Sequence, residues 1–379
     1  MNIAIDIRCL MERELTGVGE YTFHLLKHLF EIDNQNNYYL FYNSRQNVSP
    51  YIPEFPKKNI HYCQFRLPNK LLNLSLKFFK YPRLDKMIEK KYHTPEIDLF
   101  FFPNICFSKT SCPFMITAHD LSFEFFNEFL SFKRKLWHKF INPKKIFNQA
   151  EKIVAVSENT RQDLQTHYNL SFDKIEIIYS GISNNYKIVN PNDPNLKKVK
   201  KKYNLPKKFI LYLGTIEPRK NIQGLITFFQ EFQKKHPEYS LVIAGKHGWK
   251  YKEIKKTDCR KIIFTDFISD LEKRYFYNLA DMFIYPSFYE GFGFPPLEAM
   301  ACGCPVITSN NSSLSEICGQ TAILIDPNNQ ADLLFAAEQM LEKTTRESYV
   351  ERGLTKVKYY NWYTTAQALL NNFEQTIKS

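Results

Sequence analysis

The stretch MFIYPSFYEGFGFPPLEAMACGCPVI, Met282–Ile307, carries the strongest structural signal in the sequence. It begins with an apolar run typical of a buried strand, continues through a loop with Gly291 and Gly293, and ends in a short helix opened by two prolines. Glycine lets the backbone approach a ligand, and the free N–H groups of a helix start suit a phosphate. We expect Glu290 on the loop and Glu298 in the first helical turn, where a carboxylate accepts hydrogen bonds from ribose hydroxyls. The alternative is an ordinary strand–turn–helix in which Glu298 only complements the helix dipole.

Short apolar runs alternate with amphipathic stretches on both sides of this segment, which predicts an α/β protein. Strands are expected at Asn2–Ile7, Tyr38–Tyr42, Asp98–Phe102, Phe114–Ala118, Lys152–Val156, Phe209–Leu213, Ser240–Ala244, Lys261–Thr265, Met282–Tyr285, Pro305–Thr308 and Ala322–Ile325. Helices are expected at Val18–Phe30, Phe132–Gln149, Glu158–His167 (capped by Ser157), Asn221–Lys235, Leu271–Ala280 and Gln330–Lys343. Two such series predict two Rossmann-like halves that bind ligands at the carboxyl ends of their strands.

A composition break separates the two series. Residues 184–208, NNYKIVNPNDPNLKKVKKKYNLPKK, contain three prolines, many lysines and no long apolar run. Such a composition is typical of a linker, here with a short lead-in helix. The chain of 379 residues is long enough for two or three domains. We therefore expect an N-terminal domain over residues 1–183 and a C-terminal domain over residues 184–361.

Charged side chains follow several of the predicted strands. Arg219 and Lys220 come just after the strand Phe209–Leu213, and His119 directly follows Phe114–Ala118. A guanidinium offers a fork to diphosphate oxygens, and an ammonium offers a compact charge. A basic pair at a helix start is also compatible with a solvated face, but cations there oppose the helix dipole, so an anionic ligand explains them better. A single histidine at a strand end is more often structural.

Six segments, in the expected order, resemble glycosyltransferase family 4, the retaining enzymes of the GT-B fold. The segments resemble most the bacterial, mannosyltransferase-like members of that family, and together they span nearly the whole chain. The spacing from Glu290 to Glu298 in EGFGFPPLEAMACGCPVI resembles the family's signature. The other segments are TGVGEYTFHLLKHL (Thr16–Leu29), ITAHDLSFEFF (Ile116–Phe126), IVAVSENTRQDL (Ile153–Leu164), LYLGTIEPRKNIQGLI (Leu211–Ile226) and LVIAGKHGWKY (Leu241–Tyr251).

The resemblance implies two Rossmann-like domains that face each other across a cleft, with a final helix, about residues 362–379, that crosses back to the N-terminal domain. It implies transfer of a hexose, with mannose favoured, from a nucleotide-diphosphate sugar to a saccharide or lipid-linked acceptor. GDP-mannose is the favoured donor and a UDP-sugar the alternative. The pathway implied is cell-envelope polysaccharide or lipopolysaccharide biosynthesis, with no cofactor and no metal ion.

The resemblance also assigns roles to residues of this sequence. The basic pair neutralises the leaving nucleoside diphosphate, His119 contacts the transferred sugar, and Glu290 orients that sugar. Glu298 holds the donor ribose, and the turn after residue 265 holds the nucleobase through backbone atoms and packing. The catalytic group implied is Glu290, Arg219, Lys220 and His119. The donor-binding group implied is Glu298, Gly17, Gly19, Gly293, Phe294, Phe267 and Ile268.

Two other classes of protein remain as alternatives. A nucleotide-sugar epimerase on the same fold would share the donor site but need no acceptor. A non-catalytic donor-binding subunit would have lost at least one group of the site, yet all of them are present. Nucleic-acid binding ranks last: the isoelectric point is about 9.1, but no nucleic-acid-binding module occurs. The sequence also lacks the P-loop and dinucleotide-binding glycine motifs and any D-x-D pair for a metal ion.

The basic surplus is uneven. Of a net charge of +12, residues 51–150 supply 17 basic and 8 acidic side chains, whereas residues 301–350 carry 2 basic and 6 acidic ones. The segments Leu67–Tyr92 and Phe129–Phe147 mix Lys and Arg with Leu, Phe and Trp. That mixture suits a surface that rests on anionic lipid, and the alternative is solvated helix faces backed by core aromatics.

Targeting features point to the cytoplasm. No apolar run is long enough for a transmembrane helix, and the charged N-terminus does not resemble a signal peptide. Eight scattered cysteines without a C-x-x-C pair favour free thiols in a reducing compartment. We therefore expect a cytoplasmic protein, peripheral at the inner face of the cell membrane.

Overall fold

The computed structural model describes residues 1–378 except 16, 130–131, 247 and 249–259. The chain divides into two compact units. The first comprises Met1–Phe123, Phe132–Gly181 and Trp362–Ser379, and the second comprises Glu124–Ser131 and Ile182–Asn361. The predicted N-terminal domain ran unbroken from residue 1 to 183, whereas the structure groups Glu124–Ser131 with the second unit.

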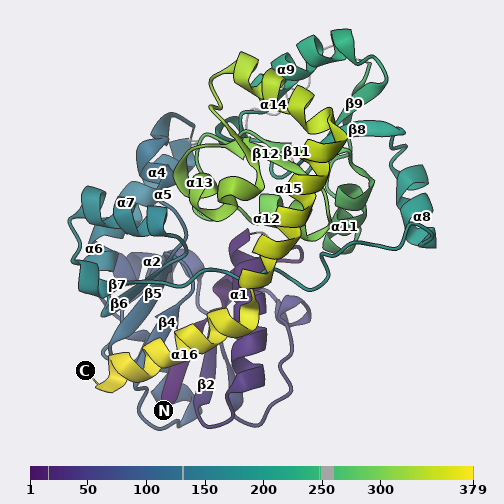
Figure 1. Ribbon diagram of the computed structural model, residues 1–379. Helices are drawn as coiled ribbons and strands as arrows, with labels where there is room; N and C mark the ends of the chain where they lie inside the picture. Colours follow the sequence, from purple (N-terminus) through teal and green to yellow (C-terminus); the bar gives the residue numbers. More distant parts are fainter. Residues whose placement is uncertain (16, 130–131, 247, 249–259, 379) are drawn as a thin grey trace. The chain divides into compact units, whose positions relative to one another are not determined.

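The first unit is built on a parallel seven-stranded sheet with the order β3-β2-β1-β4-β5-β6-β7 (Figure 1). The strands are β1 (Asn2–Asp6), β2 (Asn37–Asn43), β3 (Ile60–Phe65), β4 (Leu99–Phe102), β5 (Phe114–Ala118), β6 (Lys152–Ala155) and β7 (Ile175–Ile177). The central strand β4 reads LFFF and is buried along its whole length. Continuous apolar runs of this kind are expected where helices cover both faces of a parallel sheet.

The helices of the first unit connect these strands. They are α1 (Gly17–Ile32), α2 (Asn69–Phe78), α3 (Leu84–Tyr92), α5 (Phe132–Ile141), α6 (Pro143–Gln149), α7 (Glu158–Tyr168) and α16 (Trp362–Lys378). Helix α4 (Ser122–Phe125) lies across the division between the units. Short 3₁₀ helices occur at Arg8–Leu10, Ser49–Tyr51 and Phe172–Lys174, and in the second unit's segment at Asn127–Phe129.

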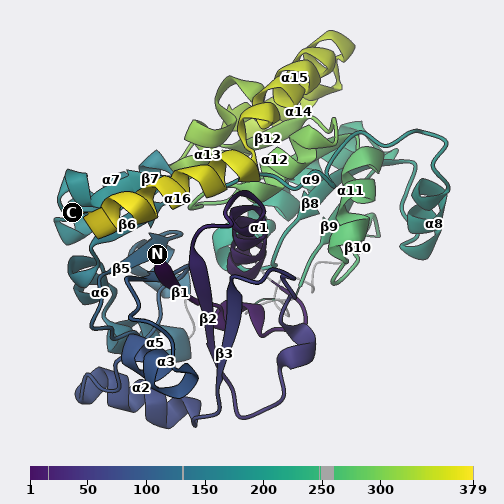
Figure 2. The ribbon, with the colours of Figure 1, turned by 90° about the horizontal axis from the view of Figure 1, so that it is seen from below.

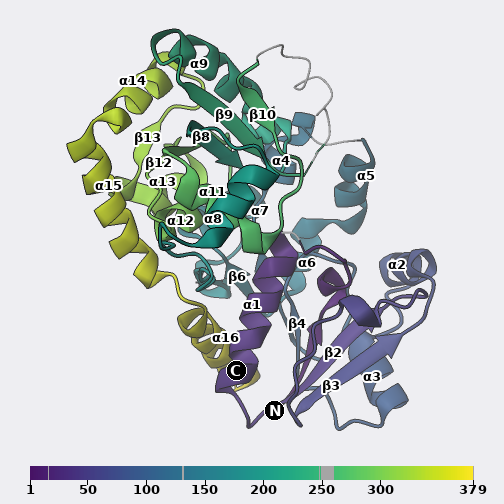
Figure 3. The same ribbon diagram turned by 90° about the vertical axis from the view of Figure 1, so that its right-hand side faces the viewer.

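The second unit is built on a parallel six-stranded sheet with the order β10-β9-β8-β11-β12-β13. The strands are β8 (Lys208–Leu213), β9 (Tyr239–Ala244), β10 (Ile262–Phe264), β11 (Met282–Tyr285), β12 (Val306–Ser309) and β13 (Ile323–Ile325). The helices are α8 (Pro194–Lys202), α9 (Ile222–Lys235), α11 (Asp270–Leu279), α12 (Phe294–Ala301), α13 (Ser312–Cys318), α14 (Gln330–Leu341) and α15 (Lys343–Lys356), with 3₁₀ turns at Pro218–Lys220, Gly319–Thr321 and Val357–Tyr359. Helices α9 and α14 pack side by side (Figure 3).

The last helix belongs to the first unit, as the sequence resemblance implied. Helix α16 packs along α1 (Figures 1 and 2). The Phe373 ring lies 5.4 Å from that of Phe101, and the Thr365 hydroxyl donates a hydrogen bond of 2.8 Å to the carbonyl of Tyr179. Buried apolar contacts of this kind supply most of the stability of a surface helix. Among the described residues, no helix is long and apolar enough to cross a membrane.

Three local predictions differ from the structure. The sequence missed the strands β3 and β7 at the two edges of the first sheet. The helix predicted over Phe132–Gln149 is two helices, because Asn142 adopts a left-handed conformation and Pro143 opens α6. Proline cannot continue a helix, since it lacks the N–H and clashes with the preceding turn. The predicted cap of α7 is confirmed: the Ser157 hydroxyl accepts a hydrogen bond of 3.1 Å from the Thr160 N–H.

Candidate active site

The loops at the carboxyl edge of the second sheet are tied together by backbone hydrogen bonds. The Gly214 N–H donates to the Ala244 carbonyl at 2.9 Å, and the Gly245 N–H donates to the Asp266 carbonyl at 2.8 Å. A β-carbon on Gly245 would lie 1.9 Å from the Gly214 carbonyl oxygen, and the φ of Gly245 is +149°. Only glycine fits there, because any side chain would push the ends of β8 and β9 apart.

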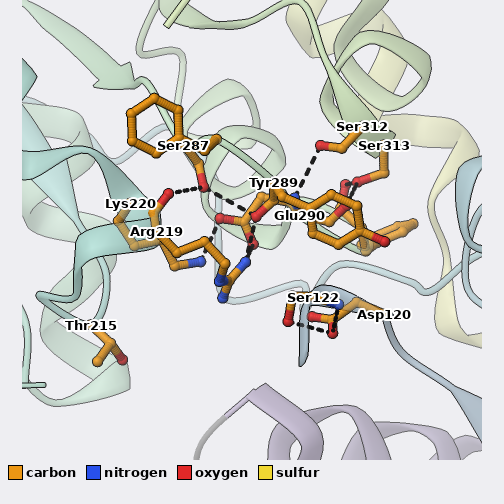
Figure 4. Close-up of polar contacts among 12 residues, drawn as sticks. Asp120, Ser122, Thr215, Arg219, Lys220, Ser287, Tyr289, Glu290, Ser312 and Ser313 are labelled. Atoms are coloured by element: carbon orange, nitrogen blue, oxygen red, sulfur yellow. Dashed lines mark hydrogen bonds and ion pairs between the residues drawn. The ribbon is translucent and has the colours of Figure 1, made fainter. Parts of the chain in front are cut away.

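The loop from β11 to α12 is anchored by serine hydroxyls (Figure 4). The Glu290 N–H donates to the Ser312 hydroxyl at 3.0 Å. The Ser313 hydroxyl lies 2.9 Å from the carbonyl of Glu290 and 2.8 Å from that of Phe292. Ser287 completes the set, with its hydroxyl 3.2 Å from the carbonyl of Arg219. These bonds hold the Glu290 loop against the 3₁₀ turn Pro218–Lys220.

Arg219 and Lys220 meet Glu290 in a buried ionic cluster. Lys220 Nζ donates to Glu290 Oε1 and, at 2.9 Å, to the Tyr285 hydroxyl. Arg219 Nη1 lies 3.3 Å from Glu290 Oε2, and Arg219 Nη2 lies 3.0 Å from Glu217 Oε1. The exposed fractions of Glu217, Lys220 and Glu290 are 6%, 7% and 8%. Two cations and two carboxylates therefore balance each other beneath the loop.

The cluster fixes the ionisation of Glu290. Burial alone would raise the pKa of this carboxyl, but the charges of Lys220 and Arg219, with hydrogen bonds from Lys220 and Ser287, outweigh burial and lower the pKa to about 2. Burial lowers the pKa of the Lys220 ammonium, the charge of Arg219 adds to that effect, and Glu290 opposes it. Glu290 is consequently an anion throughout the physiological pH range.

Glu298 lies in a different environment from the one predicted. Helix α12 begins at Phe294, so Glu298 is its fifth residue and lies in the second turn, not the first. The prediction was wrong because the helix opens one residue before its prolines. The Tyr277 hydroxyl donates a hydrogen bond of 2.9 Å to Glu298 Oε2, and Tyr186 also bonds to this carboxyl. Burial raises the pKa of Glu298, against the opposing effects of Lys273 and Tyr277.

Gly293 and Phe294 form the start of α12. Gly293 is the N-cap residue with a φ of +114°, a conformation that L side chains rarely adopt. The Phe294 ring lies 4.9 Å from that of Phe292. Phe294 is followed directly by the two prolines, which supply no N–H groups. The predicted phosphate site at this helix start therefore depends on the N–H groups of the loop and of the helix residues next to the prolines.

The predicted nucleobase turn follows β10. Asp266 adopts a left-handed conformation with a φ of +57°. The Phe267 side chain is 42% exposed, with Lys246 Nζ 4.9 Å from the centre of its ring. Ile268 is 2% exposed, so the whole residue is buried. Residues 247 and 249–251 of the resembling segment Leu241–Tyr251 lie outside the described residues.

The remaining predicted residues belong to the first unit. His119 Nε2 is 2.8 Å from the Pro103 carbonyl, and its ring is 4.7 Å from that of Tyr21. Burial lowers the pKa of His119, which favours the neutral imidazole. Helix α1 begins at Gly17, one residue before the predicted start at Val18, so Gly17 and Gly19 both lie in its first turn. The resembling segment begins at residue 16, which lies outside the described residues.

Two family models match the chain. The description "Glycosyltransferase Family 4" covers residues 15–185, and "Glycosyl transferases group 1" covers residues 195–355. The chain belongs to glycosyltransferase family 4. The chain is 30% identical over 252 residues to the serotype-specific mannosyltransferase WbdA of Escherichia coli, and this match covers 62% of the chain and 30% of WbdA. It is 33% identical over 236 residues to the O-antigen chain mannosyltransferase B of the same species, covering 60% of this chain and 61% of that protein. The chain thus spans less than two thirds of these relatives.

Several solved structures share the fold of this chain. Sucrose-phosphate synthase from Thermosynechococcus elongatus aligns with a TM-score of 0.75 at 18% identity, over 99% of this chain and 98% of that one. Anabaena HepE, in complex with UDP and glucose, aligns with a TM-score of 0.72 at 16% identity, over 99% and 100%. The two parallel sheets with their helices, and the return of α16 to the first unit, are the GT-B fold.

Sequence reasoning missed several residues that shape the candidate site. Glu217 Oε1 accepts hydrogen bonds from Nε and Nη2 of Arg219, and Glu217 lies two positions before Arg219 in the quoted motif. Tyr285, the last residue of β11, accepts a hydrogen bond from Lys220 through its hydroxyl. Tyr277 reaches Glu298 from α11, 21 residues away, and no local signal links the two. The sequence could have indicated Glu217, because it lies next to the basic pair, but it could not have indicated the distant hydroxyl of Tyr277.

Proposed function

We propose that this chain transfers mannose from GDP-mannose to a hydroxyl of a saccharide or lipid-linked acceptor, with retained anomeric configuration and without a metal ion. The observation that carries the proposal is the buried cluster of Arg219, Lys220 and Glu290 at the carboxyl edge of the second sheet. The names of the Escherichia coli relatives favour mannose. HepE, solved with UDP and glucose, makes a UDP-sugar the alternative donor.

The cluster suits the charge that the reaction develops. Breaking the bond between sugar and phosphate leaves positive charge on the ring and negative charge on the leaving diphosphate. Preorganised stabilisation of such a charge is usually the largest catalytic term. Arg219 and Lys220 would receive the diphosphate, with the N–H groups at the start of α12 beside them. Because Glu217 and Glu290 balance both cations in the cluster, these groups would act as hydrogen-bond donors to the leaving diphosphate rather than as a net positive charge.

Glu290 cannot serve as a general acid near neutral pH. A carboxyl with a pKa of about 2 holds no proton to deliver at pH 7. It can accept hydrogen bonds from sugar hydroxyls and so orient the donor. The family resemblance, rather than this pKa, is the reason that we favour attack on the face that the diphosphate leaves, with the leaving phosphate accepting the proton of the acceptor.

The other residues would complete the donor site. Glu298 would bind the donor ribose, and the turn at Phe267 and Ile268 would bind the nucleobase. His119, with Gly17 and Gly19, would contact the transferred sugar and the diphosphate from the first unit. We place the reaction in the synthesis of an O-antigen or related envelope polysaccharide, on the cytoplasmic side of the cell membrane, with the enzyme bound peripherally.

The first experiment is a panel of nucleotides and nucleotide sugars tested for thermal stabilisation and then for turnover. We expect GDP and GDP-mannose to stabilise the protein, and turnover to persist in EDTA. Stabilisation by uridine nucleotides alone would overturn the choice of donor. Consumption of the donor without a glycosylated product would favour an epimerase instead.

Site variants test the assignment of residues. Replacing Arg219 by Lys keeps the charge but loses the fork that binds Glu217 and Glu290 together, so we expect kcat/KM to fall by about 100-fold or more. Full transferase activity in both Arg219→Ala and Glu298→Ala would refute the proposed site. The anomeric configuration of the product, read by NMR, tests retention.

A further inference from the structure

Helix α2 is apolar on two opposite faces. Leu72 and Leu76 are 3% and 2% exposed and pack into the first unit. Leu71, Leu74 and Phe78 follow the same helical spacing on the other face, and they are 66%, 50% and 61% exposed. A helix that packs on one side only needs one apolar stripe. The second stripe therefore calls for a partner outside the fold.

Helix α5 presents a second row of exposed apolar side chains. Phe132 is 80% exposed, Leu136 is 57% exposed and Trp137 is 41% exposed. The two helices touch, because the Phe78 ring lies 5.7 Å from that of Phe140 and Lys77 Nζ donates to the Phe140 carbonyl. Figure 2 shows α2 and α5 at the same edge of the first unit. We call the six exposed side chains of these two rows the α2–α5 face.

The two segments that carry the α2–α5 face are strongly basic. Residues 66–84 carry five basic and no acidic side chains, and residues 129–150 carry six basic and no acidic ones. Lys70, Lys80, Lys133 and Lys139 are exposed. The next carboxylate along the chain, Asp85, is buried and accepts hydrogen bonds from the N–H groups of Ser111 and Cys112. Glu128 and Glu151, which flank the second segment, are exposed, but the basic side chains outnumber these carboxylates.

We propose that the α2–α5 face docks on the surface of an anionic phospholipid bilayer. Apolar side chains among lysines, with a tryptophan at the edge, match the acyl-chain boundary and the headgroups of such a surface. A contiguous exposed apolar patch on a soluble protein marks an interaction site. The proposal rests on the peripheral membrane binding of the proposed function and names the surface that makes the contact, and it holds whichever sugar nucleotide the second unit binds.

The test is co-sedimentation of the full chain with vesicles of phosphatidylcholine, alone or mixed with phosphatidylglycerol. We expect binding to the mixed vesicles only, and weaker binding as salt rises. In the variant Lys80→Gln, Lys133→Gln, Lys139→Gln, affinity should fall on the order of 100-fold, since each lysine at an anionic surface contributes a factor of about five. The variant Leu74→Ser, Phe78→Ser, Phe132→Ser should lose at least about tenfold.

A matched control is Phe335→Ser, which removes a side chain that is 63% exposed on α14, and it should bind vesicles as the parent does. All variants should keep their unfolding temperature and their thermal shift with nucleotide, which separates lipid binding from the proposed function. Equal vesicle binding by the parent and both triple variants would overturn the proposal. So would a concentration-dependent dimer that the serine variant abolishes, because the face would then be a self-association surface.

Discussion

Glu290 and Glu298, two carboxylates eight residues apart, lie in opposite electrostatic environments. Glu290 is held by two cations, which lower its pKa to about 2, whereas burial raises the pKa of Glu298, whose hydrogen-bond partners include the Tyr277 hydroxyl. The spacing of the pair is visible in the sequence, but the difference between them is not. The difference arises because Lys220 and Arg219 contact Glu290, whereas Tyr277 of helix α11 contacts Glu298. Only the fold brings these residues to the two carboxylates.

This contrast predicts opposite effects of removing each charge. Glu290→Gln leaves two buried cations without their shared partner and should cost about 3 kcal/mol in the free energy of unfolding at pH 7. Because its pKa is lowered from 4.5, Glu290 stabilises the fold above pH 4.5, and this effect disappears as pH falls toward 2. The difference between parent and variant should therefore shrink in that window.

Glu298→Gln should behave in the opposite sense. A raised pKa means that the ionised carboxyl destabilises the fold, and this cost appears as pH rises above 4.5. The variant should unfold at a higher temperature than the parent at pH 7 and show no such gain at pH 4, while it loses nucleotide binding. Thermal unfolding across pH measures both variants. A loss of stability at pH 7 in Glu298→Gln would contradict the assignment.

Tyr277→Phe tests whether the tyrosine positions Glu298. Loss of a hydrogen bond to a charged group should raise the KM for the donor about tenfold with little change in kcat. The pKa of Glu298 should rise further, so the acidic limb of the kcat/KM profile should move to higher pH. Tyr275→Phe, on the same helix, is the control and should leave both readings unchanged. An unchanged pH profile in Tyr277→Phe would assign Tyr277 to packing alone.

At the scale of elements, the sequence predicted well wherever a pattern is local and continuous. The strand of residues 282–285 and the cap of α7 follow from short runs of residues that need no distant partner. The strand β3, IHYCQF, mixes polar residues into an edge position, and β7 has only three residues, so neither stands out from its surroundings. The helix start at Gly17 was misplaced because glycine rarely begins a predicted helix.

Gly17→Ala separates a structural from a ligand-binding role at the start of α1. A β-carbon on Gly17 meets nothing within 4 Å, so stability should not fall, whereas one on Gly19 lies 3.1 Å from Leu15 Cδ2 and forces that side chain to move. If Gly17 approaches the donor as proposed, kcat/KM should fall on the order of 10- to 100-fold in Gly17→Ala. Kinetics combined with thermal unfolding tests this, and a fully active Gly17→Ala enzyme would remove Gly17 from the donor site.

At the scale of the whole molecule, the first unit is assembled from three pieces of chain. Residues 362–379 return to it after the entire second unit, and they pack on α1 and on the sheet. This stretch is an amphipathic helix. Its destination came from the resemblance to a known family, because periodicity reveals that a helix has an apolar face but not what that face covers.

Phe373→Ala tests how far the first unit depends on α16. Phe373 is fully buried, so its loss should cost about 3–5 kcal/mol, confined to the first unit. Calorimetry should show one unfolding transition moved to lower temperature, while a nucleotide still shifts the transition of the second unit. Gln375→Ala, exposed on the same helix, is the control. Equal destabilisation of both transitions would mean that the units unfold together.

The return of α16 also bears on how the protein is made. The ribosome releases residues 1–181 first, and the helix that covers α1 follows roughly 200 residues later. At typical rates of synthesis this interval is about 10–40 s. During it, the apolar groove left open along α1 is exposed in the nascent chain, while the second unit, whose main segment is continuous, can already fold. During translation, chaperones should therefore be needed mainly by the half that is synthesised first.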